Sequence, residues 1–600
     1  MEISNKKIAV STFGVMLVLV VLFNRSMCWL DVGVTWHKLF VAGLSVFGIV
    51  LIPFLAVKFR PLRNLMVYLI HTVLHIIQTI RDHWRVVLRG LIVYFAMIAV
   101  VCVFDYFVLA RLCGEVMVWR TIFLCGVASL VFALIAMRKI AGQKVELIFA
   151  VVALIIGLTT IFTLPRHLGV TPDDETHYTR SISLASVFDY VKYEAETKMN
   201  RDYPYLLYGV QNNTMTYEQM TSYAQELNQL YGVEYASNEN IFDITNPNMT
   251  GYKTLLGEYD IAYIAPAVVM IIAKGLRLPF TAVFLAGKLG ILLTYIAIIY
   301  YAIKRLRYGK VLLAVVGLLP TTMLFASSYS YDWWVIAWII AGYSYYIAEL
   351  QYGERKFTSQ NLRRMICCFV VGVIPKWIYV ILMFPLLFIP KDKFESDRQR
   401  KRYYIVMGIG AGAVLTFLVL PVFVRGIGMG DLRGGEGINA TAQLAYVLEE
   451  PVVYLRRMMT FFLSYTSLDH AGEYITYMGY LGQGAHFAIV LILLGVLAFL
   501  DRDEIKRPMP LIRTVHLLTI VAAIFLIITV FYLVYTPLGS DTVFGCQPRY
   551  LIPLLFPALY FIGCDGMSYR VDRRALTVVS VALISVVYFW DYWVVYLGCV

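Results

Sequence analysis

Residues 145–180 read VELIFAVVALIIGLTTIFTLPRHLGVTPDDETHYTR, and this stretch contains the contrast on which the fold depends. Segment 145–164 is almost wholly apolar and has the length of about 20 residues that a helix needs to cross the hydrocarbon core of a bilayer. The residues after it bring acidic, basic and aromatic side chains together. The stretch therefore predicts a membrane-spanning helix that leads into a polar segment at one membrane face.

The composition extends this prediction to the whole chain. Of its 600 residues, 60% are hydrophobic and only 15% are charged, with a mean hydropathy of +0.71. Soluble domains carry about 25% charged residues, so a water-soluble fold is excluded. Because backbone groups in hydrocarbon must be paired within the segment, and no barrel-type alternation is present, the spans are helices. We predict an all-α polytopic membrane protein with about 13–15 transmembrane helices.

The basic residues predict how the chain is threaded. The net charge is +12, but Lys and Arg lie in short clusters between apolar runs, where cytoplasmic loops collect them. We therefore expect a cytoplasmic N-terminus, no nucleic-acid partner, and two outer loops at 165–257 and 425–483. The mixed stretch 64–90 predicts an amphipathic helix on the inner membrane surface. Nine scattered cysteines lack the spacing of a metal site.

The expected segments follow from the apolar runs. Residues 259–276 contain Pro266 and Lys274, so we expect a helix along the outer interface and no span there. Residues 366–389 are broken by Pro375 and Lys376, which predicts two half-helices. Full spans are expected at 8–23, 39–57, 91–110, 121–137, 145–164, 280–303, 311–327, 333–349, 403–424, 484–500, 514–535, 550–567 and 575–597. Two domains are expected, an N-terminal transmembrane module at 1–144 and a core at 145–600.

The polar segment carries the candidate catalytic residues, which are Asp173, Asp174, Glu175 and His177. Pro172 is suited to open a helix, in which Asp173, His177 and Arg180 would share one face. A carboxylate at this point could accept a proton from an incoming hydroxyl. The alternative is that the acidic residues only cap a solvated helix.

A second group of polar residues is predicted at the same membrane side. Because ionisable side chains at membrane depth are functional candidates, we assign substrate binding to them. Each has an ordinary alternative, since Asp332 could cap a helix and the cations could anchor at headgroups. Arg and Lys together, with Arg456 and Arg457 nearby, suit a phosphate-bearing substrate. The candidate substrate-binding and lipid-phosphate-binding residues are Arg180, Asp332, Lys376, Gln547, Arg549 and Tyr550.

Several short motifs occur in an order that resembles one known family. It is a bacterial family of polytopic membrane proteins of unknown function that is similar to the C-class (GT-C) glycosyltransferases. The motifs are Pro172-Asp173-Asp174 with His177 and Arg180, Tyr263 with Pro266, Leu319-Pro320 to Ser330 and Asp332, Lys376 with Tyr379, and Gln547-Pro548-Arg549-Tyr550.

The resemblance implies a function. It implies transfer of a sugar, with inversion, from a polyprenyl-phosphate donor to an extracytoplasmic glycan or lipid acceptor, in a bacterial plasma membrane and with an Asp of the first outer loop as base. Asp174 stands where such a family has Glu, Glu175 where it has a neutral residue, and Lys288 where it has Arg, so the identity of the base stays open. No cofactor is required, and a divalent cation on Asp173 and Asp174 is left as an option.

Three other functions remain open. A lipid-linked glycan polymerase or ligase would transfer a whole glycan and use arginines of its outer loops. A flippase or transporter of envelope precursors would use the helix break at Pro375 as its substrate site and need no base. A scaffold for envelope assembly would use these polar residues only structurally.

Overall fold

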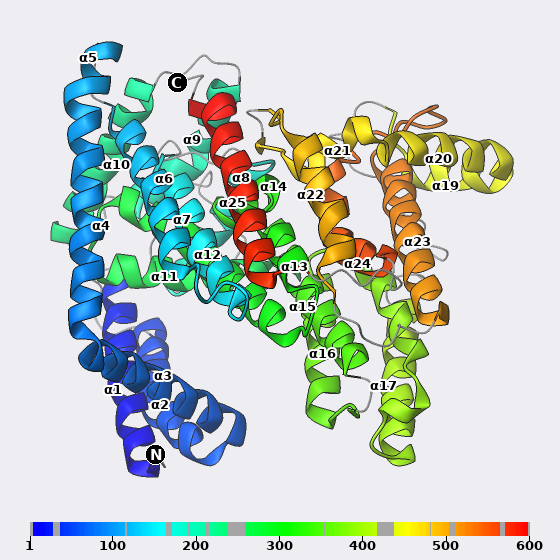
Figure 1. Cartoon of the computed structure of the whole chain (residues 1–600), viewed down its shortest axis with the longest axis horizontal. Coiled ribbons are helices and arrows are strands. Elements are labelled where there is room, and N and C mark those ends of the chain that lie inside the picture. The colour runs from blue at the N-terminus through cyan, green and yellow to red at the C-terminus, as the bar shows by residue number, and fades with distance from the viewer. Residues whose placement is uncertain are drawn as a thin grey trace. The chain divides into compact units, whose positions relative to one another are not determined.

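The computed structural model is helical throughout the part of the chain that it describes (Figure 1). Apart from the helices, the described residues contain two isolated β-bridges. The prediction of an all-α protein is therefore confirmed. The described residues are 4–27, 36–114, 117–163, 171–189, 193–211, 217–237, 258–352, 355–416, 437–479, 482–502, 510–563 and 571–597.

Eight helices within the described ranges are long and apolar enough to cross a membrane. The multi-pass prediction is confirmed, although eight is fewer than the 13–15 or so segments that apolar run lengths suggested. The eight are α1 (Asn5–Ser26), α2 (Trp36–Lys58), α4 (Trp84–Phe104) continued by η1 (Asp105–Leu109) and α5 (Ala110–Cys113), α6 (Val118–Met137), α7 (Val145–Thr163), α12 (Phe280–Arg305), α23 (Pro510–Val534) and α25 (Arg573–Tyr592) continued by η10 (Trp593–Leu597).

The shortfall arises because several expected spans are broken. The expected span 311–327 is two helices, α13 (Lys310–Gly317) and α14 (Pro320–Ala326), since a proline donates no backbone hydrogen bond. The predicted break in 366–389 is present between α16 (Ser359–Val373) and η4 (Trp377–Phe388). Other short helices are α17 (Asp397–Val414), α22 (Phe487–Leu500), η9 (Pro548–Leu551), α24 (Ile552–Ile562), and, at 259–276, η3 (Glu258–Tyr263) with α11 (Ile264–Gly275).

The chain divides into two compact units, each of which is described by itself. Unit 1 comprises Met1–Phe132, Gly157–Leu293 and Ser327–Ser330, and unit 2 comprises Ala133–Ile156, Thr294–Ala326 and Tyr331–Val600. The division into domains at residue 144 stays a prediction.

Within unit 1, the juxtaposed helices α1 and α11 form a close contact. A Cβ on Gly275, at the end of α11, would lie 2.2 Å from the carbonyl oxygen of Leu22, so only glycine fits there. Helix α11 also packs against α8 (Asp174–Ala185), which begins the polar segment. The polar segment is therefore helical where it is described, and it continues with α9 (Glu194–Gln211) and α10 (Tyr217–Ser237).

The amphipathic helix predicted at 64–90 is α3 (Arg60–Asp82), none of whose residues is buried. It ends earlier than expected, because a turn at His83 separates it from α4. The residues 84–90 therefore form the start of a candidate span. At the other end of α4, the π-helical turn places Asp105 where its Oδ1 pairs with Arg120 Nε at 2.6 Å, and both side chains are buried.

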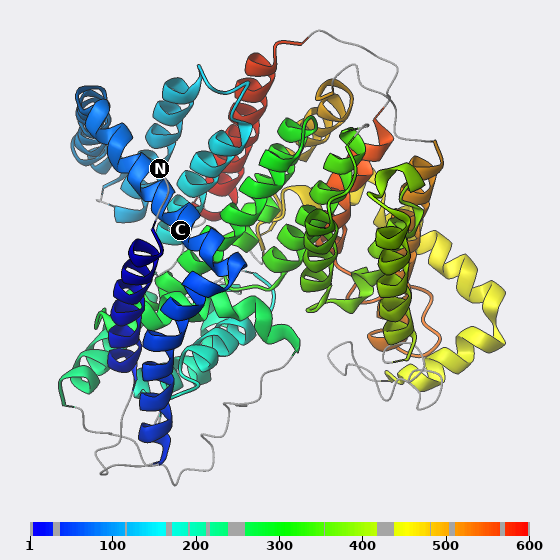
Figure 2. The same ribbon diagram turned by 90° about the horizontal axis from the view of Figure 1, so that it is seen from below.

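Within unit 2, α15 (Asp332–Gln351) is the central helix and packs against α16 and α24. A Cβ on Gly342 would meet the Phe369 ring at 2.7 Å, which shows how closely α15 and α16 approach. Two successive helices of this unit, α19 (Ala440–Glu449) and α20 (Pro451–Tyr465), meet at an angle (Figure 2). They are followed by α21 (Leu468–Ile475), so the described part of the expected loop 425–483 is largely helical.

Candidate functional site

The turn that begins the polar segment differs from the prediction. Helix α8 starts at Asp174, and Asp173 precedes it in the left-handed region with φ 59° and ψ 23°. Its carbonyl accepts the N–H of His177 at 3.0 Å, but its side chain caps no helix N–H. The expectation that Pro172 opens the helix, with Asp173 on the face of His177 and Arg180, is therefore wrong. A non-glycine residue in this conformation costs about 1–3 kcal/mol, and such residues cluster at functional sites.

Asp174 is the member of the acidic cluster that points inward. It is fully buried, and its Oδ1 accepts the hydroxyl proton of Tyr203 at 2.6 Å. Its Oδ2 lies 2.9 Å from Thr171 Oγ, which in turn lies 2.9 Å from the carbonyl oxygen of Tyr329. Burial raises the pKa of Asp174 to about 6, while the charge of Lys288 acts in the opposite direction. Asp173 and Asp174 thus have different environments despite being adjacent.

An aromatic wall surrounds Asp174. Tyr178, from the next turn of α8, lies with its ring centroid 5.6 Å from that of Tyr203, 5.0 Å from Phe284 and 5.3 Å from Tyr329. The ammonium of Lys288 sits 5.0 Å from the centroid of the Phe284 ring. These rings keep water from the carboxyl group, which explains the direction of its pKa shift.

The other candidates of this segment lie around the same turn. His177 is buried, and its Nδ1 forms a 2.6 Å hydrogen bond with the Tyr263 hydroxyl from η3. Glu175 and Arg180 are half-buried. The structure thus joins His177 to Tyr263, both of which belong to the motifs quoted above, whereas Arg180 forms no ion pair with another described residue.

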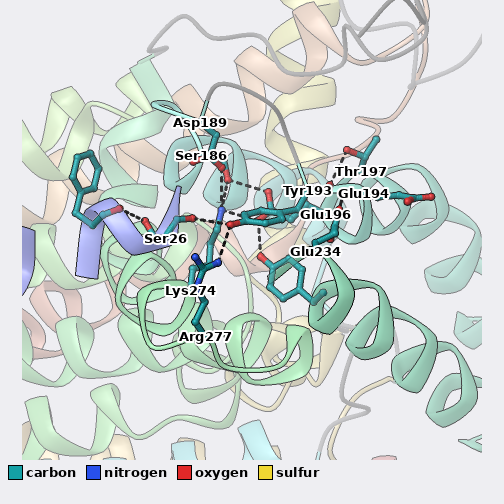
Figure 3. A network of polar contacts seen from close by, with 12 residues as sticks. Ser26, Ser186, Asp189, Tyr193, Glu194, Glu196, Thr197, Glu234, Lys274 and Arg277 are labelled. Carbon is teal, nitrogen blue, oxygen red and sulfur yellow. Dashed lines mark hydrogen bonds and ion pairs between the residues drawn. The ribbon is translucent and has the colours of Figure 1, made fainter. Parts of the chain in front are cut away.

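A separate buried cluster joins α11 to the turn after α8 and to α9, and we call it the lysine clamp; it consists of Lys274, Asp189, Glu196 and Ser186 (Figure 3). Lys274 Nζ lies 2.8 Å from Glu196 Oε1, 3.2 Å from Asp189 Oδ2 and 2.9 Å from Ser186 Oγ. Lys274 and Glu196 are completely buried. One ammonium is therefore shared by two carboxylates.

The lysine clamp is extended by hydroxyl donors and by a strained arginine. The Tyr231 hydroxyl of α10 donates to Glu196 Oε1 at 2.6 Å. Arg277, at φ 59°, places its guanidinium 4.7 Å from the ring centroid of Tyr235. Burial lowers the pKa of Lys274, but the charges of Asp189 and Glu196 outweigh it and raise the pKa overall. The clamp is thus saturated with donors and acceptors and holds the charged lysine in place.

Unit 2 contains the opposite arrangement, which we call the cation cluster; it consists of Asp332, Lys376 and Arg549. Lys376 Nζ forms an ion pair with Asp332 Oδ1, and Arg549 Nε lies 3.3 Å from Asp332 Oδ2. The side chains are 12% exposed for Lys376 and Asp332 and 8% exposed for Arg549. One carboxylate is therefore shared by two cations, and the cluster has an excess positive charge.

Local backbone structure explains these positions. Asp332 is the first residue of α15, where a carboxylate is favoured by the helix dipole. Lys376 precedes η4 at the predicted helix break, and Arg549 lies in the short helix η9. Within the described residues, Arg549 Nη1 is buried and finds no hydrogen-bond acceptor. The cluster thus contains an unused N–H donor beside its excess charge.

Aromatic rings frame the cation cluster. The Lys376 ammonium lies 4.2 Å from the ring centroid of Tyr550 and 4.9 Å from that of Tyr331. Arg549 lies 5.9 Å from the ring centroid of Phe325. Gln547 is exposed, and its carbonyl accepts the Tyr465 hydroxyl at 2.8 Å. The structure therefore brings together Asp332, Lys376, Arg549 and Tyr550, as the sequence predicted, and it gives Gln547 a backbone contact.

Two expectations receive no support from the geometry. Arg457, also expected near a phosphate, pairs with Asp541 at 2.5 Å. Within the described residues, no group of three His, Cys, Asp or Glu side chains could hold a metal ion. Both carboxyl oxygens of Asp174 already have hydrogen-bond partners, so nothing in this turn favours a divalent cation.

The sequence interpretation missed two features. Tyr203 lies far along the polar segment from Asp174, and no local pattern connects them. Lys274 was treated only as an interruption of an apolar stretch. An ionisable residue within an apolar helix is itself a signal of a buried partner, and this signal could have identified the lysine clamp.

These features define a polytopic, all-helical membrane protein with two buried ion clusters of opposite balance. Residues 154–557 match a family described as "Predicted membrane protein (DUF2142)", and the chain belongs to this family. The matched region includes the acidic turn, the lysine clamp and the cation cluster. No curated protein and no solved structure matches the chain.

Proposed function

We propose that this protein is a GT-C-type membrane glycosyltransferase that moves a sugar from a polyprenyl-phosphate donor to an extracytoplasmic glycan or lipid acceptor. The cation cluster holds the phosphate of the donor, and an acidic residue of the turn 173–174 acts as the base. The support comes from the excess positive charge of the cluster, from the conformation of the acidic turn, and from the resemblance of the motifs.

The observation that carries the proposal is the shortage of negative charge at Lys376 and Arg549. Two buried cations that share one carboxylate are costly, so such an arrangement is retained where a ligand supplies further negative charge. The phosphodiester of the donor carries one negative charge and the departing lipid phosphate up to two, which fits the excess charge and the Arg549 Nη1 donor that has no acceptor within the described residues. The rings of Tyr331 and Tyr550 reduce water access and strengthen that attraction.

The chemistry follows from these roles. The base takes the proton of the acceptor hydroxyl, whose oxygen attacks the anomeric carbon. The bond between that carbon and the phosphate oxygen breaks, its electron pair leaves with the lipid phosphate, and Lys376 and Arg549 stabilise the added charge. One displacement inverts the configuration.

The test uses the full chain in liposomes with a set of synthetic polyprenyl-phosphate hexoses and a membrane glycan extract as acceptor. Transfer of label to the acceptor is expected for the wild type. Lys376→Met removes the excess charge but leaves the Arg549–Asp332 pair matched, so the protein should fold and transfer should fall by about 10²–10³. Lys356→Met is the control, because Lys356 is exposed.

The outcomes separate the alternatives. Equal transfer by Lys376→Met and Lys356→Met would overturn the role of the cation cluster. Movement of donor lipid between leaflets without transfer would favour a flippase. Transfer of whole oligosaccharides only, with no use of single-sugar donors, would favour a polymerase or ligase.

A further inference from the structure

The two hydrogen bonds of the Thr171 hydroxyl group need two protons, but the hydroxyl group carries only one. Thr171 Oγ lies 2.9 Å from the carbonyl oxygen of Tyr329 and 2.9 Å from Asp174 Oδ2. A carbonyl oxygen can only accept, and a threonine hydroxyl has a single proton. If that proton goes to Tyr329, a second proton is needed to make the bond between Thr171 and Asp174.

The only other group in this bond that can carry a proton is the Asp174 carboxyl itself. Its Oδ1 is occupied by the Tyr203 hydroxyl, which donates at 2.6 Å. A proton on Oδ2 would be donated to Thr171 Oγ, and every donor and acceptor in the chain Tyr203, Asp174, Thr171, Tyr329 would then be used once. Buried polar groups normally reach such complete pairing.

We infer that Asp174 is a neutral positioning residue with its proton on Oδ2, and that Asp173 is the base. The second half of this inference rests on the proposed function, and the first half does not. Asp174 therefore holds the turn 171–174 in place. In this turn the backbone of Asp173 adopts the left-handed conformation.

The surroundings of Asp174 agree with a proton on the carboxyl group. The charged and titratable groups that act on it are Lys288, Glu175, Tyr203 and Tyr329. Complete burial among aromatic rings raises the pKa of Asp174 more than the charge of Lys288 and the hydrogen bonds of Tyr203 and Thr171 lower it. Asp173, by contrast, is half-buried.

Two matched variants test the inference in the liposome assay. Asp174→Asn keeps the same pattern, since the amide oxygen accepts from Tyr203 and the amide nitrogen donates to Thr171. Transfer by Asp174→Asn should stay within about tenfold of the wild type. Asp173→Asn makes the same chemical change one residue away and should reduce transfer by about 10²–10⁴. Loss of transfer in a folded Asp174→Asn protein, with activity kept in Asp173→Asn, would reverse the assignment.

Infrared difference spectroscopy tests the protonation without any activity. Spectra of the wild type and of Asp174→Asn are compared at about pH 5, below the pKa of Asp174 and above that of exposed carboxyl groups. The wild type should show the carbonyl band of a protonated carboxyl group, shifted in D₂O, that Asp174→Asn lacks. Absence of this band would overturn the neutral state of Asp174.

The two readouts distinguish the two proposals. A wild type with the band but without sugar transfer would contradict the proposed function and leave the neutral Asp174 standing. Sugar transfer by a wild type that lacks the band would contradict the neutral state of Asp174 and leave the proposed function standing. Full transfer by Asp173→Asn would remove Asp173 as the base, whatever the spectrum shows.

Discussion

The lysine clamp and the cation cluster have opposite charge balance. In the clamp, Lys274 is shared by the carboxylates of Asp189 and Glu196, whereas in the cluster Asp332 is shared by Lys376 and Arg549. The clamp is closed, because Lys274 and Glu196 are fully buried and hydroxyl donors complete it. The cluster is partly exposed, and one guanidinium N–H of Arg549 has no acceptor among the residues that the structure describes.

This difference separates a structural cluster from a binding cluster. In the clamp, hydroxyl groups of the protein donate hydrogen bonds to the carboxylate of Glu196 and stabilise the excess negative charge. No further ligand is needed there. In the cluster, two cations share the single carboxylate of Asp332, and Arg549 Nη1 has no hydrogen-bond acceptor within the described residues. Charge balance together with donor saturation, and not burial alone, indicates which ionic cluster has room for a ligand.

Breaking the lysine clamp should have the largest effect on stability. Lys274→Met leaves Asp189 and Glu196 buried without their ammonium group, which should lower the free energy of unfolding by about 3–5 kcal/mol. Thermal unfolding in detergent measures this change. Glu196→Gln added to Lys274→Met should recover part of the loss. A Lys274→Met protein as stable as the wild type would show that the clamp is not structural.

Removing one cation from the cluster should affect binding and leave stability nearly intact. Arg549→Gln still leaves Lys376 paired with Asp332, so the affinity for polyprenyl phosphate should fall by about 2–4 kcal/mol while unfolding changes little. Equilibrium binding in nanodiscs measures the affinity. Arg457→Gln is the matched control, because Arg457 already has Asp541 as its partner. Equal losses in both variants would point to a general effect of surface charge.

Removing the shared carboxylate should change binding in the other direction. Asp332→Asn leaves both cations without a counter-charge, so affinity for a lipid phosphate should rise by about tenfold, or about 1.4 kcal/mol, and depend more steeply on salt. The same nanodisc titration at two salt concentrations tests this. Weaker binding by Asp332→Asn would mean that the carboxylate orients the cations more than it competes with the ligand.

The smallest predicted effect is a pH dependence beside the clamp. Burial raises the pKa of Glu234 to about 7; the backbone N–H of Glu194 opposes this and the charge of Glu196 adds to it. The folded state therefore holds a proton that the unfolded state loses first, so stability falls as pH rises from about 4.5 to about 7. In Glu234→Gln, the free energy of unfolding should fall by about 1 kcal/mol less over this pH range, a value that allows for solvent screening. An unchanged slope in pH-dependent unfolding would contradict it.

The sequence was most informative where one local rule decides the structure. Apolar run length located the long helices, and Pro375 with Lys376 marked the break before η4. It was least informative where tertiary contacts decide. Pro172 was expected to open a helix, yet the bonds of Thr171 to Tyr329 and Asp174 start it at Asp174. The partners of Lys274 come from the turn after α8 and from α9, which no periodicity connects to α11.

The most direct test of the account compares the binding of a polyprenyl monophosphate with that of the corresponding polyprenol, using the full chain in nanodiscs. The account predicts that the phosphate binds at least about a hundredfold more tightly, which corresponds to about 2.7 kcal/mol, and that Lys376→Met abolishes most of this difference. Equal binding of the two lipids, or an undiminished preference in Lys376→Met, would contradict it.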